Sequence, residues 1–554
     1  GRIVAVTTAT SVGLEALRQM RTDRRRRRVA DMEWFELLYR VYITALIGGF
    51  LLVWLSSLVT DAPFTQSQFD TLIHDGPRCV GFVMSVVCFL GMRSGSNGGP
   101  VSVEEAEVRH VLLAPVNRAA VLRHPAVQRL RTMAFTGTLA GGVTGLVLSK
   151  RVPKEWGRGP NQWIVCGAVA GALIGASFVI AALLVHSFRI DRRIVTVAAT
   201  AIVAWHAASA FLGSHPWAVF NEFGEFMLAV SHATNLIAIA TLIVLAVLAV
   251  WRAGHLSIEA LARRSALVSQ LKFAVTLQDI RTVVLLRRQL SQEHMREKPW
   301  FAVPSFLRRN IAVTRCLRSL AHFPARRMAR MALLAVTSAV SLVAVWRGTT
   351  PALVVSGLAL FMLGLDVIEP LSQEVDQPDR TDALPIERGL LLTQHLLVPA
   401  LTIIPFVLVG IAVAYAFEPH GMTLIAGVLI GIPAALAGVA GAVINAVKGA
   451  PDPLSEANSG LYMPPEVSGM TTVIRAAWPP VVAIIGSTPA VALVKASENG
   501  DNIPAALVRT ALGIGMVCFL TAGWVRQREK IRAAFRNFAN PQNAPSAPTS
   551  TQKV

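Results

Sequence analysis

The chain has 554 residues, of which 53% are hydrophobic and only 15% are charged, and its formal net charge is +19. Soluble domains carry about 25% charged residues, so this composition excludes an ordinary soluble protein and predicts one that crosses a bilayer many times. The basic residues lie in loops beside apolar runs, which is the positive-inside pattern of membrane proteins. We therefore expect membrane lipids, and not nucleic acid, as the surroundings of these charges.

The first 35 residues hold eight arginines, including the run Arg24 to Arg28, and no apolar core of a signal peptide. They are expected to form a cytoplasmic tail. A membrane helix needs about 20 mainly apolar residues, and the chain predicts twelve such spans with both termini cytoplasmic. The expected spans are Leu37–Val59, Val80–Met92, Thr132–Leu148, Trp163–Val185, Val195–Leu212, Asn235–Trp251, Met331–Trp346, Leu353–Val367, Leu391–Phe417, Leu424–Val447, Val473–Val494 and Ala505–Trp524.

The outer loop before the second span is expected to hold Asp61, Asp70 and Asp75. Between the fifth and sixth spans lies the stretch GSHPWAVFNEFGEFM, which is too short to cross the membrane and too apolar for a plain loop. It predicts a re-entrant or surface helix on the outer face.

The expected fold class is an all-α polytopic membrane protein, built as two parallel six-helix repeats with amphipathic cytoplasmic helices. Residues 1–251 form the first half, including the tail 1–35, and residues 331–525 form the second half. Between them, residues 252–330 carry sixteen Lys and Arg against four Asp and Glu, with two stretches of helical periodicity. Such a connector either lies in the lipid headgroup layer or is a solvated linker. Residues 526–554 are expected to be a cytoplasmic tail, disordered in its last part.

No catalytic motif is present in the sequence. It holds no GxxxxGK[ST] phosphate loop, HExxH or GxSxG motif, and its five cysteines are scattered without a CxxC pair, so neither an enzyme nor a metal site is expected. An ionisable or amide side chain within a span is a candidate for contact with a transported substrate. His206 and Asn235 are the weak candidates, and for His206 a hydrogen bond between helices is the favoured alternative.

One charged segment occurs twice, after the second span of each half. Residues 100–122 read PVSVEEAEVRHVLLAPVNRAAVL and residues 370–392 read PLSQEVDQPDRTDALPIERGLLL. Without any gap, two prolines, a serine, an acid and an arginine match. The matched pairs are Pro100 with Pro370, Ser102 with Ser372, Glu104 with Glu374, Pro115 with Pro385, Val116 with Ile386, Arg118 with Arg388 and Leu122 with Leu392.

Each copy opens with acids and then has Pro-[Val/Ile]-x-Arg before an apolar run. Because proline is tolerated in the first helical turn, Pro115 and Pro385 are expected to start the third span of each half. The chain before them would protrude into the cytoplasm as a short helix or turn. Duplication at the same place favours a docking function over a plain loop. The residues expected to act there are Glu104, Glu105, Pro115, Val116, Arg118, Glu374, Asp376, Pro385, Ile386 and Arg388.

This segment resembles the coupling helix of type V ATP-binding-cassette exporter permeases, in an actinobacterial-like form with both halves in one chain. The resemblance implies a permease subunit of a bacterial plasma membrane that has no ATPase site of its own. It implies two separate P-loop ATPase subunits as partners, which hold ATP and Mg, while this chain binds no cofactor. The expected cargo is hydrophobic or amphipathic: a drug, a lipid or a peptide. Neither copy has the Gly-Thr that often follows the acid in that family, and Pro378 and Asp382 have no equivalents in the first copy.

Two other classes stay open at this point. An ion-coupled secondary transporter of twelve spans also carries matching loops in its halves, although no spaced chain of Asp, Glu and His crosses the expected spans. A membrane-embedded enzyme or scaffold would need a polar cluster at one membrane face, and the sequence shows no convincing one.

Overall fold

The computed structural model describes residues 63–153, 159–212, 216–228, 233–266, 296–303, 310–377, 385–447, 477–500 and 502–539, except for several positions between 97 and 115. Before residue 63 it describes only scattered positions. The chain divides into two compact units, residues 1–278 and residues 279–554. This boundary falls inside the expected connector 252–330, whose later part contributes a helix to the second unit.

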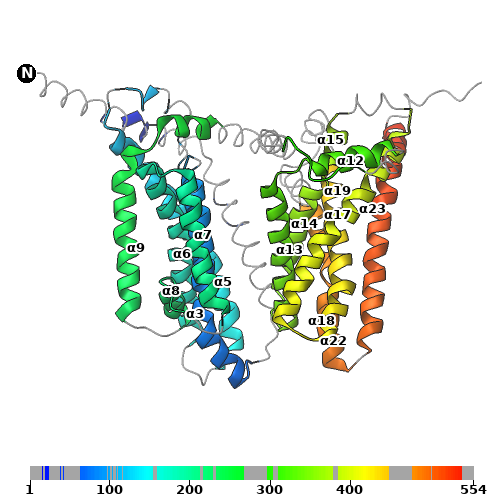
Figure 1. The fold of residues 1–554 in the computed structure, drawn as a ribbon, viewed down its shortest axis with the longest axis horizontal. Coiled ribbons are helices and arrows are strands. Elements are labelled where there is room, and N and C mark those ends of the chain that lie inside the picture. The colour runs from blue at the N-terminus through cyan, green and yellow to red at the C-terminus, as the bar shows by residue number, and fades with distance from the viewer. Residues whose placement is uncertain are drawn as a thin grey trace, which may run out of the picture. The chain divides into compact units, whose positions relative to one another are not determined.

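The described residues of the first unit form helices joined by short turns (Figure 1). Four long helices and a fifth one that continues into a 3₁₀ turn are long and apolar enough to cross a membrane. A short helix between the fourth and fifth is largely buried. The elements are α3 (Gln66–Ser96), α5 (Arg118–Arg151), α6 (Pro160–Phe188), α7 (Arg192–Phe211), α8 (Asn221–Leu228), α9 (Ala233–Trp251) and η2 (Arg252–His255).

The second unit begins with a short amphipathic helix and continues with the spans. Its elements are α12 (Ile311–Ala321), α13 (Ala325–Trp346), α14 (Ala352–Val367), α15 (Glu369–Asp376), α17 (Arg388–Phe417), α18 (Gly421–Ala426), the π-helical turn η4 (Gly427–Gly431), α19 (Ile432–Val447), α22 (Pro489–Asn499) and α23 (Ile503–Ala539). The helices α18, η4 and α19 form one candidate span, and α22 is the end of another, Ala477–Ser497. Within this unit α12 and α15 lie at one end of the bundle, and α18 and α22 lie at the other (Figure 1).

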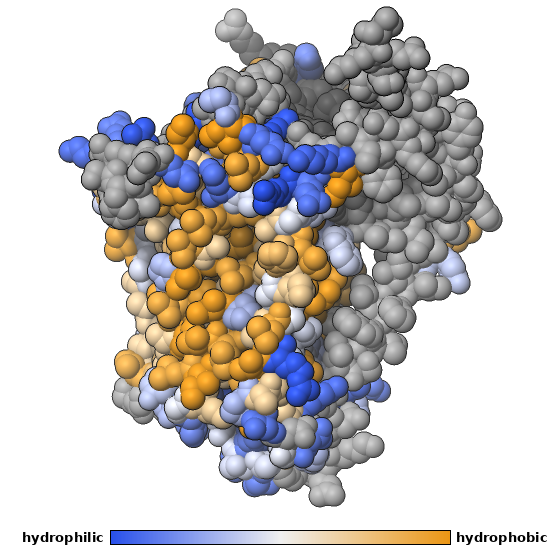
Figure 2. All heavy atoms as spheres, turned by 90° about the vertical axis from the view of Figure 1, so that its right-hand side faces the viewer, coloured by the Kyte–Doolittle hydropathy of each residue, from blue (hydrophilic) through white to orange (hydrophobic). Residues whose placement is uncertain are grey.

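Ten of the described helices are long and apolar enough to span a bilayer, or eleven if the bent pair of α14 and α15 is one span. The chain is therefore an all-α, multi-pass membrane protein. The expected first span, Leu37–Val59, lies outside the described residues. The surface of the second unit supports this conclusion, because Figure 2 shows a broad apolar band between more hydrophilic ends. Side chains such as Phe519 and Leu512 on α23 are 73% and 70% exposed, as suits a surface that faces lipid tails.

Several helices begin earlier than their apolar runs predict. The helix α3 starts at Gln66, so the expectation that Asp70 and Asp75 lie in a loop is wrong. The first turns of α3 are stabilised by local polar pairs, including the 2.8 Å ion pair of Arg78 with Asp75. A helix propagates past the apolar window wherever such pairs support it, because each added residue gains a backbone hydrogen bond.

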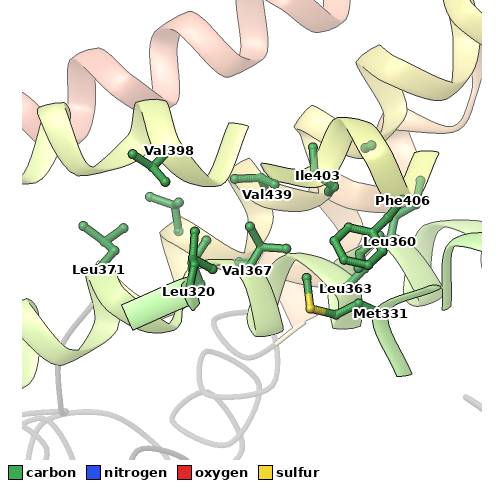
Figure 3. Close-up of a cluster of buried hydrophobic side chains, with 14 of the residues drawn as sticks. Leu320, Met331, Leu360, Leu363, Val367, Leu371, Val398, Ile403, Phe406 and Val439 are labelled. Atoms are coloured by element: carbon green, nitrogen blue, oxygen red, sulfur yellow. The ribbon is translucent and has the colours of Figure 1, made fainter. Parts of the chain in front are cut away.

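Each unit has its own buried apolar core. In the second unit Leu320 of α12 joins residues from α13, α14, α15, α17 and α19 in one cluster (Figure 3). Met331, Leu363 and Leu371 are fully buried there. Truncation of such a leucine to alanine costs about 2–5 kcal/mol of stability. The amphipathic helix α12 is therefore an integral part of the second unit.

The helices α5 and α6 touch along two matched rows of glycine. Gly137, Gly141 and Gly145 on α5 repeat every fourth residue, as do Gly167, Gly171 and Gly175 on α6. A Cβ atom at Gly141 would overlap the carbonyl oxygen of Gly167, and one at Gly167 would overlap that of Gly141. Without side chains the two backbones approach closely, which is how small residues at this spacing hold membrane helices together.

Candidate functional site

The second copy of the repeated segment begins at a sharp bend between two helices. The helix α14 ends at Val367, and α15 starts at Glu369 with an axis bent by 59°. Pro370 lies in the first turn of α15, where its missing N–H needs no partner. Glu369, Leu371 and Glu374 are all buried. The expected protruding helix is present, but it is folded back against the bundle.

Three arginines on α12 and α13 bind the three carboxylates of this bend. Arg330 grips Asp366 with two nitrogens, Nε at 2.7 Å from Oδ2 and Nη2 at Oδ1. This two-pronged geometry is the strongest that a guanidinium and a carboxylate form. It fixes the end of α14 to α13.

Arg327 is the most buried member of the set. Its Nη2 donates to the backbone oxygen of Asp366 at 2.5 Å and lies 3.3 Å from Oε2 of Glu369. The guanidinium also stacks on the ring of Phe323, with 4.0 Å between Cζ and the ring centroid. Only 9% of the Arg327 side chain and 7% of the Glu369 side chain are exposed. Removal of one partner from such a pair costs about 3–5 kcal/mol, because it strands a buried charge.

The third pair joins α12 to α15. Arg315 Nη1 lies 3.2 Å and 3.4 Å from the two carboxylate oxygens of Glu374. Beside it the thiol of Cys316 is fully buried, and burial together with the negative charge of Glu374 raises the pKa of Cys316 to about 12. The acid that was expected to face a partner protein therefore holds α15 to α12 instead.

A polar cavity of about 280 Å³ lies between α12, α15 and α17, next to this ion pair. It is lined by Arg315, Cys316, Arg318, Ser319, Pro370, Gln373, Glu374 and His395. His395 of α17 is completely buried, and its Nδ1 donates to the backbone oxygen of Leu391 at 2.9 Å. Its Nε2 finds no hydrogen-bond partner in the described protein.

The remaining predicted residues of the second segment lie nearer the surface. Asp376 and Arg388 are half-buried, Pro385 is exposed, and Ile386 is half-buried. Glu387 is the residue directly before α17, its side chain makes no capping hydrogen bond, and it forms an exposed 3.2 Å pair with Lys530 of α23. Among the described residues of this copy, Gln377, Pro385, Glu387 and Leu390 are exposed, so the turn 385–387 is one accessible part of it.

In the first segment the structure describes Val116 and Arg118, whereas Glu104, Glu105 and Pro115 lie outside the described residues. Val116 is half-buried and Arg118 is exposed. Val101, Val103, Val108 and Leu112 are buried in the core of the first unit. This copy is therefore also anchored by apolar side chains, with Arg118 on its accessible side.

The expected helix starts at Pro115 and Pro385 are wrong. The helices begin three residues later, at Arg118 and Arg388, after the caps Asn117 and Glu387. Asn117 accepts a 3.0 Å hydrogen bond from the backbone N–H of Ala119, which satisfies a donor that the first helical turn leaves free. Both helices nevertheless begin at equivalent residues in the gap-free register.

The weak substrate candidates within the spans are occupied by contacts inside the protein. His206 is 1% exposed, donates from Nδ1 to the backbone oxygen of Ile202 at 2.9 Å, and accepts at Nε2 from the backbone N–H of Phe220 at 3.1 Å. Its ring also stacks on Phe220. This arrangement ties α7 to the residues that lead into α8. Asn235 is also buried, in the first turn of α9.

A second cavity, which the sequence did not indicate, lies at the opposite end of the second unit. Its volume is about 350 Å³, and aliphatic side chains of α13, α17, α18, η4, α22 and α23 form most of its wall. Its polar edge includes Glu418 and His420. Apolar runs alone do not reveal such a space, because they give no information on how closely two spans approach.

The three arginines were also not foreseen as partners of the acids. The sequence showed Arg315, Arg327 and Arg330 only as part of a basic stretch, and showed Asp366 and Glu369 only as acids at the end of a span. The sequence did offer one indication of these ion pairs: basic residues lie just before or at the start of the seventh expected span, and acidic residues lie at the end of the eighth. Among the described residues, no group of three or more His, Cys, Asp or Glu side chains is placed to hold a metal ion.

Comparison with known proteins gives no match: no family model, no curated protein and no solved structure is similar to this chain.

Proposed function

We propose that this chain is the transmembrane subunit of an ATP-driven exporter of the type V ATP-binding-cassette class. Two P-loop ATPase subunits would dock on the repeated segments 100–122 and 370–392. The observation that carries this proposal is the ion-paired bend of α14 and α15. Asp366, Glu369 and Glu374 fasten the second segment to α12 and α13 through Arg330, Arg327 and Arg315.

Such a bend would transmit force, because its ion pairs oblige α14 and α15 to move together with α12 and α13. A push on the exposed turn 385–387 acts on the first turn of α17, and α15 is continuous with α14 across one residue. The three ion pairs join this corner to α12 and α13. Rigid elements with two packed arrangements are the physical means by which a docking site drives a distant one.

We further propose that the chain consists of two parallel six-span halves in a bacterial plasma membrane, with both termini and the α12 and α15 end on the cytoplasmic side. One observation supports the repeat, and another supports the orientation in the membrane. The third helix of each half begins at equivalent residues, Arg118 and Arg388. The basic residues of α12 and of the first turns of α13 lie at the end of the bundle that the positive-inside rule assigns to the cytoplasm.

The test is purification of the tagged full chain from its native membrane in a mild detergent, followed by mass spectrometry of the stoichiometric partners. We expect a protein with a GxxxxGK[ST] loop at two copies per chain, since this chain has no such loop. Recovery of the intact chain without any ATPase, together with transport that persists in vanadate and collapses with an uncoupler, would reject the proposal in favour of an ion-coupled carrier.

A further inference from the structure

The apolar cavity of the second unit has a mainly aliphatic wall and charged side chains at its edge. Its volume of about 350 Å³ lies within the usual range of ligand pockets, about 300–1,000 Å³. The wall includes Ala339 and Leu342 of α13, Ala414 of α17, and Ile430 of η4. Trp346 and Met422, which also line it, are 44% and 43% exposed, so the cavity reaches the surface of the helix bundle.

Two large residues of the cavity wall occupy positions at which the first unit has glycines. In the register that aligns Pro100 with Pro370, Gly137 and Gly141 correspond to Val407 and Ile411 of α17. The Cβ position of Gly427 lies 3.0 Å from Ile411 Cγ2, and that of Gly431 lies 3.4 Å from Val407 Cγ1. In the first unit, glycine faces glycine where α5 meets α6. In the second unit Gly427 and Gly431 face the side chains of Ile411 and Val407 instead of glycines, and these four residues line the cavity.

The helix that carries Gly427 and Gly431 is locally irregular. Gly427–Gly431 is a π-helical turn within the span, between α18 and α19. Such turns are uncommon and occur frequently at functional sites. Gly427, Ile430 and Gly431 of this turn line the cavity. The irregular backbone and the cavity thus lie at the same place.

The charged edge of the cavity favours a negatively charged headgroup. Glu418 is only 22% exposed, and its Oε1 already receives Arg347 Nε at 2.7 Å. The more accessible groups are His420, which lines the cavity, is 73% exposed and lies 3.8 Å from Glu418, and Arg347, which is 55% exposed and lies beside the lining residues. Arg347 Nη2 also donates to the backbone oxygen of Phe417 at 3.2 Å. The side chains of His420 and Arg347 both carry N–H groups that can donate hydrogen bonds. A phosphate at this edge would gain charge-assisted hydrogen bonds.

We propose that this cavity holds one aliphatic chain of an anionic membrane lipid, with the lipid headgroup at Arg347 and His420. The aliphatic wall matches the chain, the accessible basic groups match the headgroup, and the surrounding bilayer supplies the molecule. Between α5 and α6 of the first unit, where glycine faces glycine, the close backbones leave no room for such a chain. Binding does not depend on an ATPase, whereas the identification of this lipid as cargo rests on the proposed exporter function.

The experiment uses the full-length chain in nanodiscs of phosphatidylcholine that contain a small fraction of phosphatidylglycerol with a photoreactive diazirine in its acyl chain. After illumination, the adducts are mapped by mass spectrometry of the digested protein. We expect adducts on α17 around residues 407–414 and on η4, and loss of them when unlabelled phosphatidylglycerol is in excess. Excess phosphatidylcholine should compete several-fold less well.

Two variants locate the chain and the headgroup. Ala414→Phe fills the cavity and should remove these adducts, whereas Leu408→Phe, on the half-exposed side of the same helix, should retain them. The double change of Arg347→Gln and His420→Gln should remove the preference for the anionic lipid while adducts persist. Equal competition by both lipids in the unchanged protein would overturn the proposal without any variant. Adducts that avoid the cavity, as expected if another segment of the chain or a second copy fills it, would overturn it as well.

The outcome is separable from that of the exporter proposal. If the adducts appear in the cavity while no ATPase co-purifies and transport persists in vanadate, the lipid site stands and the exporter function fails. If an ATPase co-purifies but no adducts appear in the cavity, the docking proposal stands and the lipid-site proposal is rejected.

Discussion

Arg315 of α12 and Glu374 of α15 form an ion pair in which the carboxylate is 7% exposed and the guanidinium 28%. The pair joins two short helices at the same end of the second unit (Figure 1). Sequence comparison placed Glu374 in a segment that repeats Glu104, and favoured a contact with a partner protein. The geometry gives it an internal role, whereas Arg118, Pro385 and Glu387 are among the exposed residues of the two segments.

Replacement of Glu374 by Gln should destabilise the second unit by about 3 kcal/mol, because Arg315 keeps its charge and loses its counter-ion. The measurement is the free energy of unfolding in a denaturing detergent titration. Glu387→Gln, which breaks the exposed pair with Lys530, is the matched control and should cost no more than about 1 kcal/mol. Similar losses in the two variants would show that the buried pair does not hold α12 in place.

Cys316 should resist alkylation, since its raised pKa of about 12 keeps the thiol protonated and the helix packing covers it. The thiolate is the reactive form. Because the pKa is raised, the thiol stays neutral from about pH 7 to about pH 9, and labelling by a neutral maleimide should stay slow across this range.

The labelling is best followed in a chain whose other four cysteines are replaced by alanine. Arg318→Cys in the same background, with Cys316 also replaced, is the control, because Arg318 lies on the exposed side of α12. It should react rapidly and faster at higher pH. Equal rates at the two positions would mean that α12 does not pack as described.

The glycine contact between α5 and α6 predicts that substitutions at two neighbouring glycines change the stability of the protein very differently. Gly141→Ala should destabilise the protein by about 1–3 kcal/mol, as overpacking does, because its Cβ would overlap the backbone of Gly167. Gly142→Ala meets only a methyl group at 3.8 Å. It should be neutral or slightly stabilising, since alanine favours helix by about 1 kcal/mol over glycine. Both variants share this helix-propensity gain, so the difference between their unfolding midpoints isolates the contact with α6.

Arg118→Glu should uncouple ATP hydrolysis from transport in the purified complex while the chain folds normally, because Arg118 is exposed at the start of α5. Arg388→Glu should act in the same way in the second segment. Hydrolysis and transport are measured together in proteoliposomes. Arg123→Glu, an exposed position further along α5, is the control and should stay coupled. Normal coupling in both reversals would remove these segments from the docking interface.

Much of the architecture is readable in the sequence, because a bilayer imposes a length and an apolar composition on every helix that crosses it. This constraint predicted the position of every described span, although the polar turns that extend α3 and α5 beyond the apolar windows were missed. The helices α5 and α17 both begin at the arginine of the repeated Pro-[Val/Ile]-x-Arg motif. The start of each helix was misjudged by three residues, because the chain stays non-helical after the prolines up to the N-cap positions, Asn117 and Glu387.

The sequence by itself determined the membrane class, the order of spans and the duplicated segment, because these depend on composition and spacing along one chain. Only the tertiary structure decided which charges meet. Arg327 and Glu369 lie far apart in sequence, and no local pattern indicates that one neutralises the other. The tertiary structure also decided that glycine faces glycine between α5 and α6, whereas Gly427 and Gly431 face Ile411 and Val407. Helix separation depends on the side chains of both facing helices, and a linear pattern records only one of them at a time.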